Sequence, residues 1–425
     1  MSEMQVPSHW KIVKLGDMVR ESIRDGVHQT PTYVNYGIPF IKGKDIFNNK
    51  VSFANCSYIS LEEHLKISKK VKPELEDILL TKVGTVGNVA IIETSNNFSI
   101  FVQVALIKPK LDEVNSRFLM YVLHSRCGQE EIASKTSQST MRFIGTQKIA
   151  TIKIPLPPLP EQKTIAHTLR TIQKAKETRQ RELELERERK AALMQYLFTH
   201  GTGNEPRKQT NIGKIPETWE VVTLDKVCEF LQYGTSKLCD SDTSGIPVLR
   251  IPNVIGGKIN IFDLKFTKPE KKEFEKLSLE AGDLLFVRTN GRKEYIGRCA
   301  VFCGKPPHAM FASYLIRVRL KLNTLLPEFF QFYTMTHRGK SYLSGRASNA
   351  ADGKFNINTQ TIKAVLAPIP SLDEQHEIIG TLKACDRKIQ ALEKEIALTD
   401  ELFHAMLEQL MIGKISTQPL TETYV

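Results

Sequence analysis

A proline-led helical segment that occurs twice constrains the fold of this chain most strongly. The first copy starts at Pro155 with PLPPLPEQKTI, and the second starts at Pro368 with PIPSLDEQHEI. Matched positions keep one offset of 213 residues as far as Leu197 and Leu410. An offset that stays constant without a gap over roughly forty residues indicates two copies of one rigid element.

Each copy is predicted to form a long helix. Ser371 and Glu374 give a capping-box pattern in the second copy, and Pro160 suits the first helical turn of the first copy. Gly201 and Gly413 follow the last apolar residues, where helices tend to end. Apolar residues that recur at the heptad spacing predict a coiled-coil seam. The predicted seam comprises Ile165, Leu169, Ile172, Ile378, Leu382, Ile389, Leu392 and Ile396.

The seam of the first copy is apolar at both ends but charged between Lys176 and Lys190, which leaves its register against the second copy open. Ordinary packing inside a domain is the alternative interpretation of one such seam. A helix of about 38 residues spans roughly 57 Å, more than most domains need. Because the segment occurs twice, we expect a spacer made of two long helices that lie against each other; if they pair antiparallel, the chain has an internal pseudo-two-fold axis.

The blocks that precede the two helices also repeat each other, more loosely. Trp10 and Trp219, the two tryptophans of the chain, occupy one matched position, where each is expected to fill a small core. In each block a strand that follows Asp77 or Asp283 leads into a glycine-rich loop and a returning strand. A short aromatic helix comes later in each block and is followed by a polar loop, at 134–142 in the first block and at 345–354 in the second. A scaffold whose loops differ in length and charge is typical of recognition domains.

The predicted fold class is therefore α+β: two mixed α/β domains joined by two long antiparallel coiled-coil helices, with an internal pseudo-two-fold repeat. The predicted boundaries are 1–155 for the first domain, 156–202 for the central helix, 203–368 for the second domain, 369–415 for the C-terminal helix and 416–425 for a tail.

Composition narrows the class of protein. A length of 425 residues exceeds one ordinary core, and 41% apolar with 25% charged residues is typical of a globular chain. The net charge of +12 favours a polyanionic partner, nucleic acid before an anionic membrane surface, although a merely basic protein is an alternative. The seven cysteines are scattered and form no C-x-x-C pair, so neither a disulfide framework nor a zinc site is expected. No apolar run or leader pattern points to a membrane, and we expect a cytoplasmic protein.

Motifs for catalysis are absent from the sequence. The nearest match to the base-gripping tetrapeptide of a DNA amino-methyltransferase, Lys305-Pro-Pro-His308, has the wrong residues on both sides. Gly84-x-x-Gly87 lacks the lysine of a phosphate-binding P-loop, and no H-E-x-x-H occurs. We therefore expect no catalytic residue and no metal site. A fused methyltransferase or nuclease and a stand-alone DNA-binding or coiled-coil scaffold are the alternative interpretations, and co-purification with a methyltransferase tests the stand-alone scaffold.

The duplicated order of motifs resembles the specificity subunits of Type I restriction-modification enzymes. The resemblance rests on P-L-P-P-L-P-E-Q-x-x-I at 155–165, P-I-P-S-L-D-E-Q-x-x-I at 368–378, I-P-E-T-W at 215–219 and the strands that end in a basic residue before a glycine-rich loop. One departure is Glu76, which stands where the second block has Gly282. The resemblance implies that each domain is a target-recognition domain that reads one half of a split, asymmetric DNA sequence, while the helices set the gap.

The resemblance also implies partners and cofactors. The expected partners are double-stranded DNA, two methyltransferase subunits and restriction/translocase subunits, with no membrane. This chain is expected to bind no cofactor, since S-adenosylmethionine and ATP are used by the partner subunits. Basic side chains attract phosphates, and a few polar side chains reach base edges. The candidates for DNA contact are Lys42, Lys44, Thr81, Lys82 and Thr85 in the first domain and Arg250, Asn253, Arg288, Asn290, Arg292 and Arg298 in the second.

Overall fold

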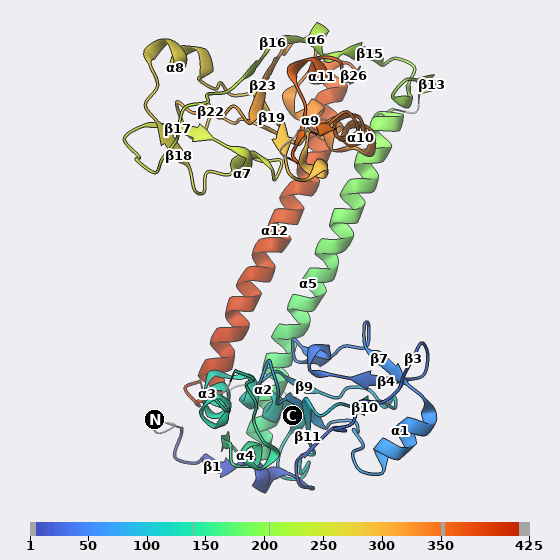
Figure 1. Cartoon of the computed structure of the whole chain (residues 1–425), viewed down its shortest axis with the longest axis vertical. Helices are drawn as coiled ribbons and strands as arrows, with labels where there is room; N and C mark the ends of the chain where they lie inside the picture. Colours follow the sequence, from blue (N-terminus) through green and yellow to red (C-terminus); the bar gives the residue numbers. More distant parts are fainter. Residues whose placement is uncertain (1–5, 139, 204, 350–352, 416–425) are drawn as a thin grey trace. The chain divides into compact units, whose positions relative to one another are not determined.

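The chain forms two compact units that share two long helices. The structure, a computed structural model, describes residues 6–138, 140–203, 205–349 and 353–415. The first unit comprises the residues up to 180 and those from 394 on, and the second comprises residues 181–393. Helix α5 (Leu159–His200) and helix α12 (Leu372–Met411) each contribute to both units (Figure 1).

The first unit has two four-stranded sheets and a cover of short helices. Its elements before α5 are β1 (Lys11–Lys14), η1 (Leu15–Met18), β2 (Arg24–Asp25), β3 (Tyr33–Val34), β4 (Ile38–Ile41), η2 (Gly43–Asp45), β5 (Ile46–Phe47), β6 (Lys50–Val51), β7 (Ser57–Ile59), α1 (Leu61–Ser68), β8 (Ile78–Thr81), β9 (Val89–Ile91), β10 (Ser99–Ile100), β11 (Val104–Ile107), α2 (Ser116–His124), α3 (Arg126–Lys135), α4 (Thr146–Ala150) and β12 (Lys153–Leu156). The antiparallel sheet has the order β2-β11-β8-β9, and the second sheet has the order β10-β4-β7-β3.

The second unit repeats this arrangement. Its elements are β13 (Arg207–Thr210), β14 (Gly213–Pro216), β15 (Glu220–Thr223), α6 (Leu224–Val227), β16 (Cys228–Tyr233), β17 (Ile246–Leu249), α7 (Ile251–Val254), β18 (Lys265–Thr267), α8 (Lys271–Leu277), β19 (Leu284–Val287), β20 (Thr289–Asn290), η3 (Lys293–Tyr295), β21 (Cys299–Val301), β22 (Met310–Phe311), β23 (Leu315–Leu320), α9 (Pro327–Met335), α10 (His337–Gly345), β24 (Ser348–Asn349), β25 (Phe355–Asn356), α11 (Thr359–Lys363) and β26 (Leu366–Ile369). The order β16-β23-β19-β21 matches β2-β11-β8-β9, and β18-β17-β22 matches β7-β4-β10. The predicted repeat of two mixed domains is confirmed.

Each unit has two hydrophobic cores, one on each face of its four-stranded antiparallel sheet, which we call the main sheet. Successive side chains of a central strand point alternately into the two cores. In β8, Ile78 and Leu80 belong to the cluster that contains α2 and the ends of the long helices, whereas Leu79 belongs to the cluster shared with the second sheet. In β19, Leu284 and Leu285 divide between two clusters in the same way. Because successive side chains of a strand point to opposite faces, a fully apolar strand is buried on both sides. Each unit is therefore a stack of helices, main sheet and second sheet.

The duplicated tryptophan and proline motifs meet on a short ladder in each unit. Strand β1 pairs antiparallel with β12, and β15 pairs antiparallel with β26. Trp10 Nε1 donates to Glu161 Oε2 over 3.1 Å, and Trp219 Nε1 donates to Glu374 Oε2 over 2.8 Å. Each tryptophan therefore joins the start of its domain to the first turn of the long helix that follows it.

The glutamine that follows each of these glutamates fastens the helix from the inside. Gln162 is fully buried, accepts a hydrogen bond from Asn115 N at 2.9 Å and donates to Pro157 O at 2.9 Å. Gln375 is equally buried and makes the matched bonds with Leu326 N and Pro370 O at 2.8 and 3.1 Å. Since an unpaired buried amide is costly, these bonds explain why both halves carry Glu-Gln at this position.

Both long helices begin and end close to the caps that the sequence predicts. Glu374 N donates to Ser371 Oγ at 3.2 Å, and Pro160 lies in the first turn of α5. Gly201 and Gly413 have left-handed φ values of +70° and +66°, which favour glycine at a helix C-terminus. The helices contain 42 and 40 residues. The domain boundaries stay a prediction, and the tail at 416–425 lies outside the described residues.

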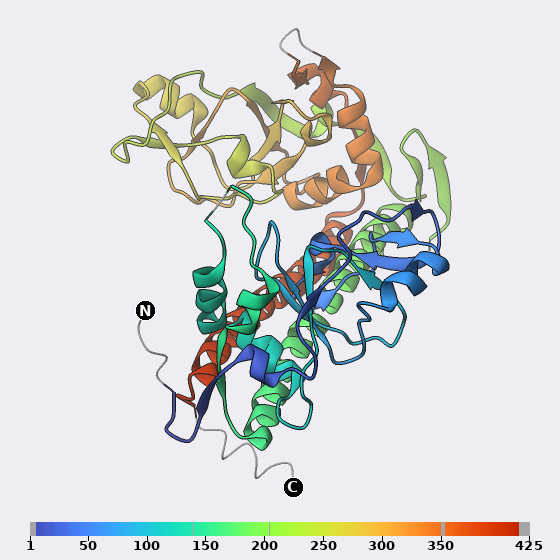
Figure 2. The ribbon, with the colours of Figure 1, turned by 60° about the horizontal axis from the view of Figure 1, so that its bottom comes forward.

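The predicted seam is only partly buried. Ile165 and Leu169 are buried with Phe403 in the first unit, and Ile378 and Leu382 are buried in the second. Leu392 is buried, while Ile172, Ile389 and Ile396 are half-buried. Figure 2 shows the C-terminal part of α12 beside α2 and α3, where the Tyr121 and Phe403 rings lie 6.0 Å apart.

The charged residues in the middle of α5 form ion pairs with residues of α12. In the first unit, Lys176 pairs with Asp400 and Arg179 pairs with Glu395. In the second, Lys190 pairs with Asp386 at 2.8 Å, and further ion pairs are Arg187–Glu393 and Lys388–Glu182. Within each unit the helices run antiparallel, because higher numbers on α5 meet lower numbers on α12. Charge complementarity therefore sets the register that the sequence left open.

Two helices depart from the sequence expectation. Polar loops are predicted at 134–142 and 345–354, but Ser134 and Lys135 end α3, and Gly345 ends α10. Both helices carry few apolar residues, so the helical period is weak. Ser139 and residues 350–352 of these loops lie outside the described residues. In the part of the chain that is described, no helix has the length and apolarity to cross a membrane.

Candidate nucleic-acid interface

In each unit the glycine-rich loop lies beside the polar loop that comes much later in the chain. In the first unit, Gly84 N donates to Arg142 O and Ile144 N donates to Lys82 O, both at 2.9 Å. We call residues 82–88 with 137–138 and 140–143 the first loop pair. In the second unit, Ile357 N donates to Arg288 O at 2.9 Å, and β20 pairs with β25, which pairs with β24. We call residues 288–298 with 346–349 and 353–356 the second loop pair. Backbone pairing thus merges two distant polar segments into one surface.

The second loop pair carries cations that rest on aromatic rings. Arg288 lies over the Tyr233 ring at 4.7 Å, Arg298 over Tyr295 at 4.3 Å, Arg346 over Tyr342 at 4.2 Å and Lys293 over Phe355 at 6.0 Å. Stacking on a ring holds a guanidinium in place while its edge stays able to donate hydrogen bonds. Arg292 and Arg298 are exposed, and Asn290 Oδ1 accepts from Arg292 N at 2.9 Å. This surface suits an anionic ligand with flat hydrogen-bonding edges.

The first loop pair is less charged because its central cation is neutralised. Lys82 is 8% exposed, and its Nζ donates to the Asp25 carboxylate. Burial raises the pKa of the Asp25 carboxyl, but the hydrogen bond and charge of Lys82 outweigh burial and lower it overall. Thr85 and Arg142 are exposed on this surface, together with the apolar side chain of Met141.

Three predicted contact residues have structural roles in the interior. Thr81 is fully buried, and its hydroxyl donates to Thr85 O and accepts from Asn88 N, which fixes the glycine-rich loop. Asn253 is 1% exposed and accepts from Arg250 N at 2.9 Å. Lys82 is held by Asp25 as described. Their polar side chains make hydrogen bonds inside the fold, which favours a structural role over direct contact with a ligand.

The remaining candidates lie at the surface. Lys42 lies over the Tyr33 ring at 4.2 Å, and the exposed Lys44 donates to Asn55 O at 3.0 Å. Arg250 is half-buried and donates to Asp263 O at 2.7 Å. Arg288 is half-buried within the second loop pair. Whether any of them touches a ligand stays a prediction.

Sequence reasoning missed several residues that the fold brings to the two surfaces. Arg142, Lys293 and Arg346 join the loop pairs, and Tyr233 comes from β16, far away in the sequence. The polar loops were visible in the sequence as segments before a strand. Their pairing with the glycine-rich loops carries no local signal, because it depends on backbone hydrogen bonds between segments more than fifty residues apart.

A buried carboxylate supports the strand that leads into each glycine-rich loop. Asp77 and Asp283 are each 1% exposed. Asp77 Oδ2 accepts from Lys108 Nζ at 2.8 Å, and Asp283 Oδ1 accepts from Arg319 Nε at 2.8 Å. Burial raises the pKa of Asp77 in spite of Lys108. Such groups orient the loops, and their burial separates them from any substrate.

Glu76 and Gly282 adopt the same left-handed backbone conformation, although one is a glutamate and the other a glycine. Glu76 has φ +67° and Gly282 has φ +98°, so both residues adopt the left-handed conformation before the shared aspartate. That region favours glycine, and a glutamate there is strained. The aspartate holds the turn in both units, because Asp77 Oδ2 accepts from Glu74 N and Asp283 Oδ2 accepts from Glu280 N, both at 2.9 Å.

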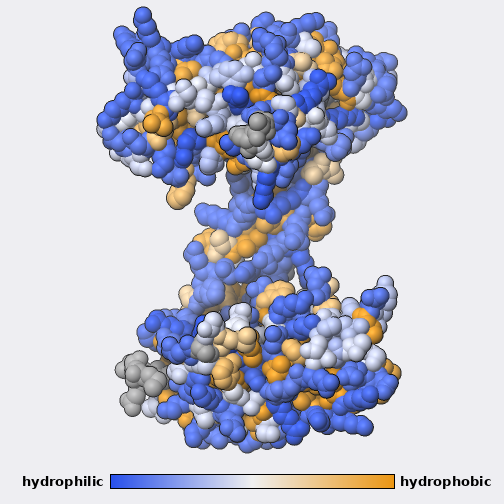
Figure 3. Space-filling view, viewed as in Figure 1, coloured by the Kyte–Doolittle hydropathy of each residue, from blue (hydrophilic) through white to orange (hydrophobic). Residues whose placement is uncertain are grey.

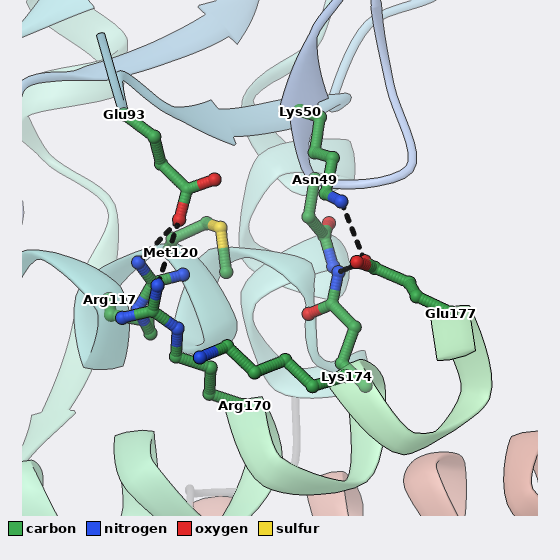
Figure 4. Close-up of a pocket in the computed structure, with 9 residues that line it drawn as sticks. Asn49, Lys50, Glu93, Arg117, Met120, Arg170, Lys174 and Glu177 are labelled. Carbon is green, nitrogen blue, oxygen red and sulfur yellow. Dashed lines mark hydrogen bonds and ion pairs between the residues drawn. The ribbon is translucent and has the colours of Figure 1, made fainter.

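A pocket in the first unit lies where its domain meets α5. Figure 4 shows Glu93 facing Arg117 and Arg170, and Lys50 facing Glu177. The Glu93 carboxylate lies 2.6 Å from Arg117 and 3.7 Å from Arg170. Burial raises the pKa of Glu93, but the hydrogen bond and charge of Arg117, with the charge of Arg170, outweigh burial and lower it. These ion pairs neutralise much of the pocket, which fits packing better than ligand binding.

A metal centre is not formed by the described residues: within 6–138, 140–203, 205–349 and 353–415, no cluster of three or more His, Cys, Asp or Glu side chains could hold an ion. The seven cysteines are free thiols. Burial raises the pKa of the Cys299 thiol to about 12, so this thiol stays protonated and unreactive at neutral pH.

Comparison with known proteins connects this geometry to a family. The model of the family described as "Type I restriction modification DNA specificity domain" matches residues 7–187 and 216–399. The chain is 24% identical over 437 residues to the EcoKI specificity subunit of Escherichia coli strain K12, which covers 98% of this chain and 92% of that one. It is also 24% identical over 430 residues to the MjaVIII specificity subunit of Methanocaldococcus jannaschii, covering 99% and 96%.

Solved structures agree on the fold. The HsdS subunit from Thermoanaerobacter tengcongensis aligns with a TM-score of 0.51 and 18% identity over 97% of this chain and 99% of that one. The specificity subunit from M. genitalium aligns with a TM-score of 0.56 and 14% identity over 96% and 97%. Together with the two matches to the family model, they confirm the predicted fold class of two mixed domains joined by two long helices that pack together.

Proposed function

Since the chain belongs to the family of Type I restriction-modification DNA specificity domains, we propose that each of its loop pairs reads one half of a bipartite, asymmetric DNA target. The chain itself is a sequence-recognition subunit and not an enzyme, as its named relatives are specificity subunits. Its work is to bind DNA and to assemble into the restriction-modification complex.

The observation that carries the proposal is the loop pair itself. In both units a matched scaffold joins a glycine-rich loop and a distant polar loop through backbone hydrogen bonds. The two surfaces differ in charge and length, while the strands beneath them correspond. Exposed arginines on such a surface can attract phosphates and can donate two hydrogen bonds to a guanine edge. Two different surfaces on one chain suit two different half-sites.

The candidate contacts that we retain are the exposed and half-buried side chains of these surfaces and of the strand ends beside them. They are Lys42, Lys44, Thr85 and Arg142 in the first unit and Arg250, Arg288, Asn290, Arg292, Arg298 and Arg346 in the second.

Partners supply the chemistry in this proposal. Two methyltransferase subunits and the restriction/translocase subunits assemble with the chain, and S-adenosylmethionine and ATP bind to those subunits. The chain binds no cofactor of its own. Resemblance to the specificity subunits supports this division of labour, and pull-down of the full chain from cells that express the whole system tests it.

Methylation mapping tests the assignment of half-sites. In cells that carry the intact system, the modified sequence reveals both half-sites. Replacing Arg292 and Arg298 by alanine should relax or weaken recognition of one half-site only, by about 1–3 kcal/mol for each lost bidentate base contact. Thr85→Ala with Arg142→Ala should act on the other half-site.

The control is Lys226→Ala, which removes one exposed cation from α6, outside both loop pairs. This variant should leave the preference at both half-sites unchanged. If the second-unit variants changed both half-sites equally, the assignment of one half-site to each loop pair would be wrong.

A further inference from the structure

A loop beside the second loop pair presents an aromatic side chain to solvent on a rigid backbone. Residues 253–265 of this loop correspond to residues 45–57 of the first unit at one offset of 208. Asn260 N donates to Asn253 O at 2.8 Å, and Ser52 N donates to Asp45 O at the same distance. The two loops therefore share one backbone hydrogen bond, although the strands β5 and β6 are formed only in the first unit.

Buried and charged side chains hold the second-unit loop from beneath. Asn253, 1% exposed, donates through Nδ2 to Asn260 O at 2.9 Å and to Phe262 O at 3.2 Å. Arg250 donates to Asp263 O at 2.7 Å, and Phe262 N donates to Asn260 Oδ1 at 2.9 Å. Bonds on both sides of Phe262 fix its backbone. The interior position of Asn253, a predicted contact residue, is thus explained by support of this loop.

The exposed side chains are what distinguishes the two copies. In the first unit, Phe53 turns inward, with its ring 5.6 Å from that of Phe98, and the next residue is Ala54. At the matched positions of the second unit, Ile261 is 58% exposed and Phe262 is 82% exposed. The phenylalanine of this loop therefore packs inside the first unit as Phe53, whereas in the second unit it stands one matched position later, as Phe262, and is exposed. Isolated apolar side chains are common on surfaces (Figure 3). Two adjacent exposed apolar side chains are less common, in particular on a loop that a buried asparagine holds in place.

The surroundings of Phe262 favour a polyanion over an apolar partner. Arg298 Nη1 donates to Ile255 O at 3.4 Å, which joins this loop to the second loop pair. Lys258 is exposed within the loop, whereas Arg250 and Lys265 pair with the Asp263 carboxylate at 3.1 and 3.5 Å. A protein partner that covered Phe262 would also have to accept these cations, whereas a DNA duplex offers phosphates beside an apolar base stack.

We infer that Phe262 is a wedge that stacks on or inserts at a base step of the DNA next to the half-site read by the second loop pair. This inference rests on the proposed function. Proteins that deform DNA insert phenylalanine, leucine or isoleucine between base steps, and the cost of unstacking is offset by new contacts. A wedge needs a fixed backbone, and Asn253 and Arg250 provide one. The first unit, with Ala54 at the same place, has no such wedge.

Fluorescence of 2-aminopurine tests the inference directly. Duplexes that carry the mapped target, with 2-aminopurine at successive steps along the second half-site and its flanks, are titrated with the full chain and its co-purifying subunits. The wild type should raise the fluorescence at one step, because an unstacked 2-aminopurine is brighter. Phe262→Ala should abolish the rise and weaken binding by roughly tenfold, as loss of one base–aromatic contact does. Phe262→Leu should retain most of both.

The matched control is Leu238→Ala. Leu238 is 97% exposed on another loop of the same unit, so its removal deletes an equally exposed apolar side chain. This variant should behave as the wild type, and unchanged melting temperatures should show that all variants are folded. Phe262→Ala that retains both the fluorescence change and the affinity of the wild type would overturn the inference. Phe262→Ala that binds DNA normally but no longer captures the partner subunits would overturn it too, because the side chain would then contact protein.

The proposed function fails in a different way. If the wild type did not prefer the mapped duplex to a scrambled duplex of the same length, sequence reading by this chain would be refuted, whatever Phe262 did.

Discussion

The two units agree where side chains are buried and differ where they are exposed. Gln162 and Gln375 are fully buried and make the same hydrogen bonds at the start of their helices. On the glycine-rich loops, by contrast, the exposed side chains differ: the first loop exposes Thr85, whereas the second exposes Arg292 and Arg298. Buried polar groups tolerate little change because each needs its partner, and exposed loops are free of that restriction.

The comparison predicts which buried carboxylate matters more. Asp283→Ala should destabilise the second unit by about 3–5 kcal/mol, because Arg317, 3% exposed, would keep a buried charge without its carboxylate. Asp77→Ala should cost less, about 1–3 kcal/mol. Lys108 would still pair with Glu74 at 2.8 Å, and Arg20 is exposed enough to reach water. Burial also raises the pKa of Asp77, so its charged form gains less from the fold.

Hydrogen exchange resolved by peptide measures both effects, because a chain of two units does not unfold in one step. Loss of protection should be confined to the unit that carries the substitution. Equal losses in Asp77→Ala and Asp283→Ala would show that the different partners of the two carboxylates do not matter.

A glycine in each glycine-rich loop gives a smaller contrast. Gly297 and Gly87 both have left-handed φ values, +78° and +101°. A Cβ on Gly297 would lie 2.4 Å from Leu343 Cβ, inside the core, whereas a Cβ on Gly87 would meet the end of the flexible Gln129 side chain at 2.7 Å. Gly297→Ala should therefore cost about 2–4 kcal/mol and Gly87→Ala about 1–2 kcal/mol.

Thermal melting of the two variants checks this order, and Gly291→Ala is the control because a Cβ there meets open space. Gly87→Ala as damaging as Gly297→Ala would mean that Gln129 cannot move aside. The loop pair would then be as tightly packed in the first unit as in the second.

The smallest effect is expected where each domain pairs with its own part of a long helix. Glu93 pairs with Arg117 and Arg170 in the first unit, whereas Glu328 pairs with Lys383 at 3.0 Å in the second. The Glu93 side chain is exposed and that of Glu328 is half-buried, and both ion pairs lie at the surface, so Glu93→Gln and Glu328→Gln should each cost about 0.2–1 kcal/mol at neutral pH.

The pH dependence of the Glu93→Gln effect tests the ion pairs of Glu93. Because Arg117 and Arg170 hold the pKa of Glu93 below its ordinary value of 4.5, its contribution is present above that pH and is lost as the pH falls through the lowered pKa. The stability difference between wild type and Glu93→Gln should therefore shrink below about pH 4.5. Urea denaturation at a series of pH values measures it, and a difference that grew in acid would contradict the ion-pair account.

Much of the architecture was determined by the sequence alone. The constant offset of the proline-led segments, the caps at Ser371 and Gly201 and the matched tryptophans predicted two domains and two long helices. These signals are local or periodic, so they survive without knowledge of the fold. The exposed candidates Arg292 and Arg298 were found in the same way, from a polar loop between two apolar strands.

Only the tertiary structure decided which polar side chains are exposed and able to contact a ligand. Thr81, Lys82 and Asn253 look like surface residues in the sequence, yet the fold buries them with partners. It also supplied acidic partners for the charged middle of α5 and joined each glycine-rich loop to a distant polar loop. Burial and pairing depend on segments that are far apart in the chain. A local pattern reports how a segment repeats, but it does not report what lies against that segment once the chain is folded.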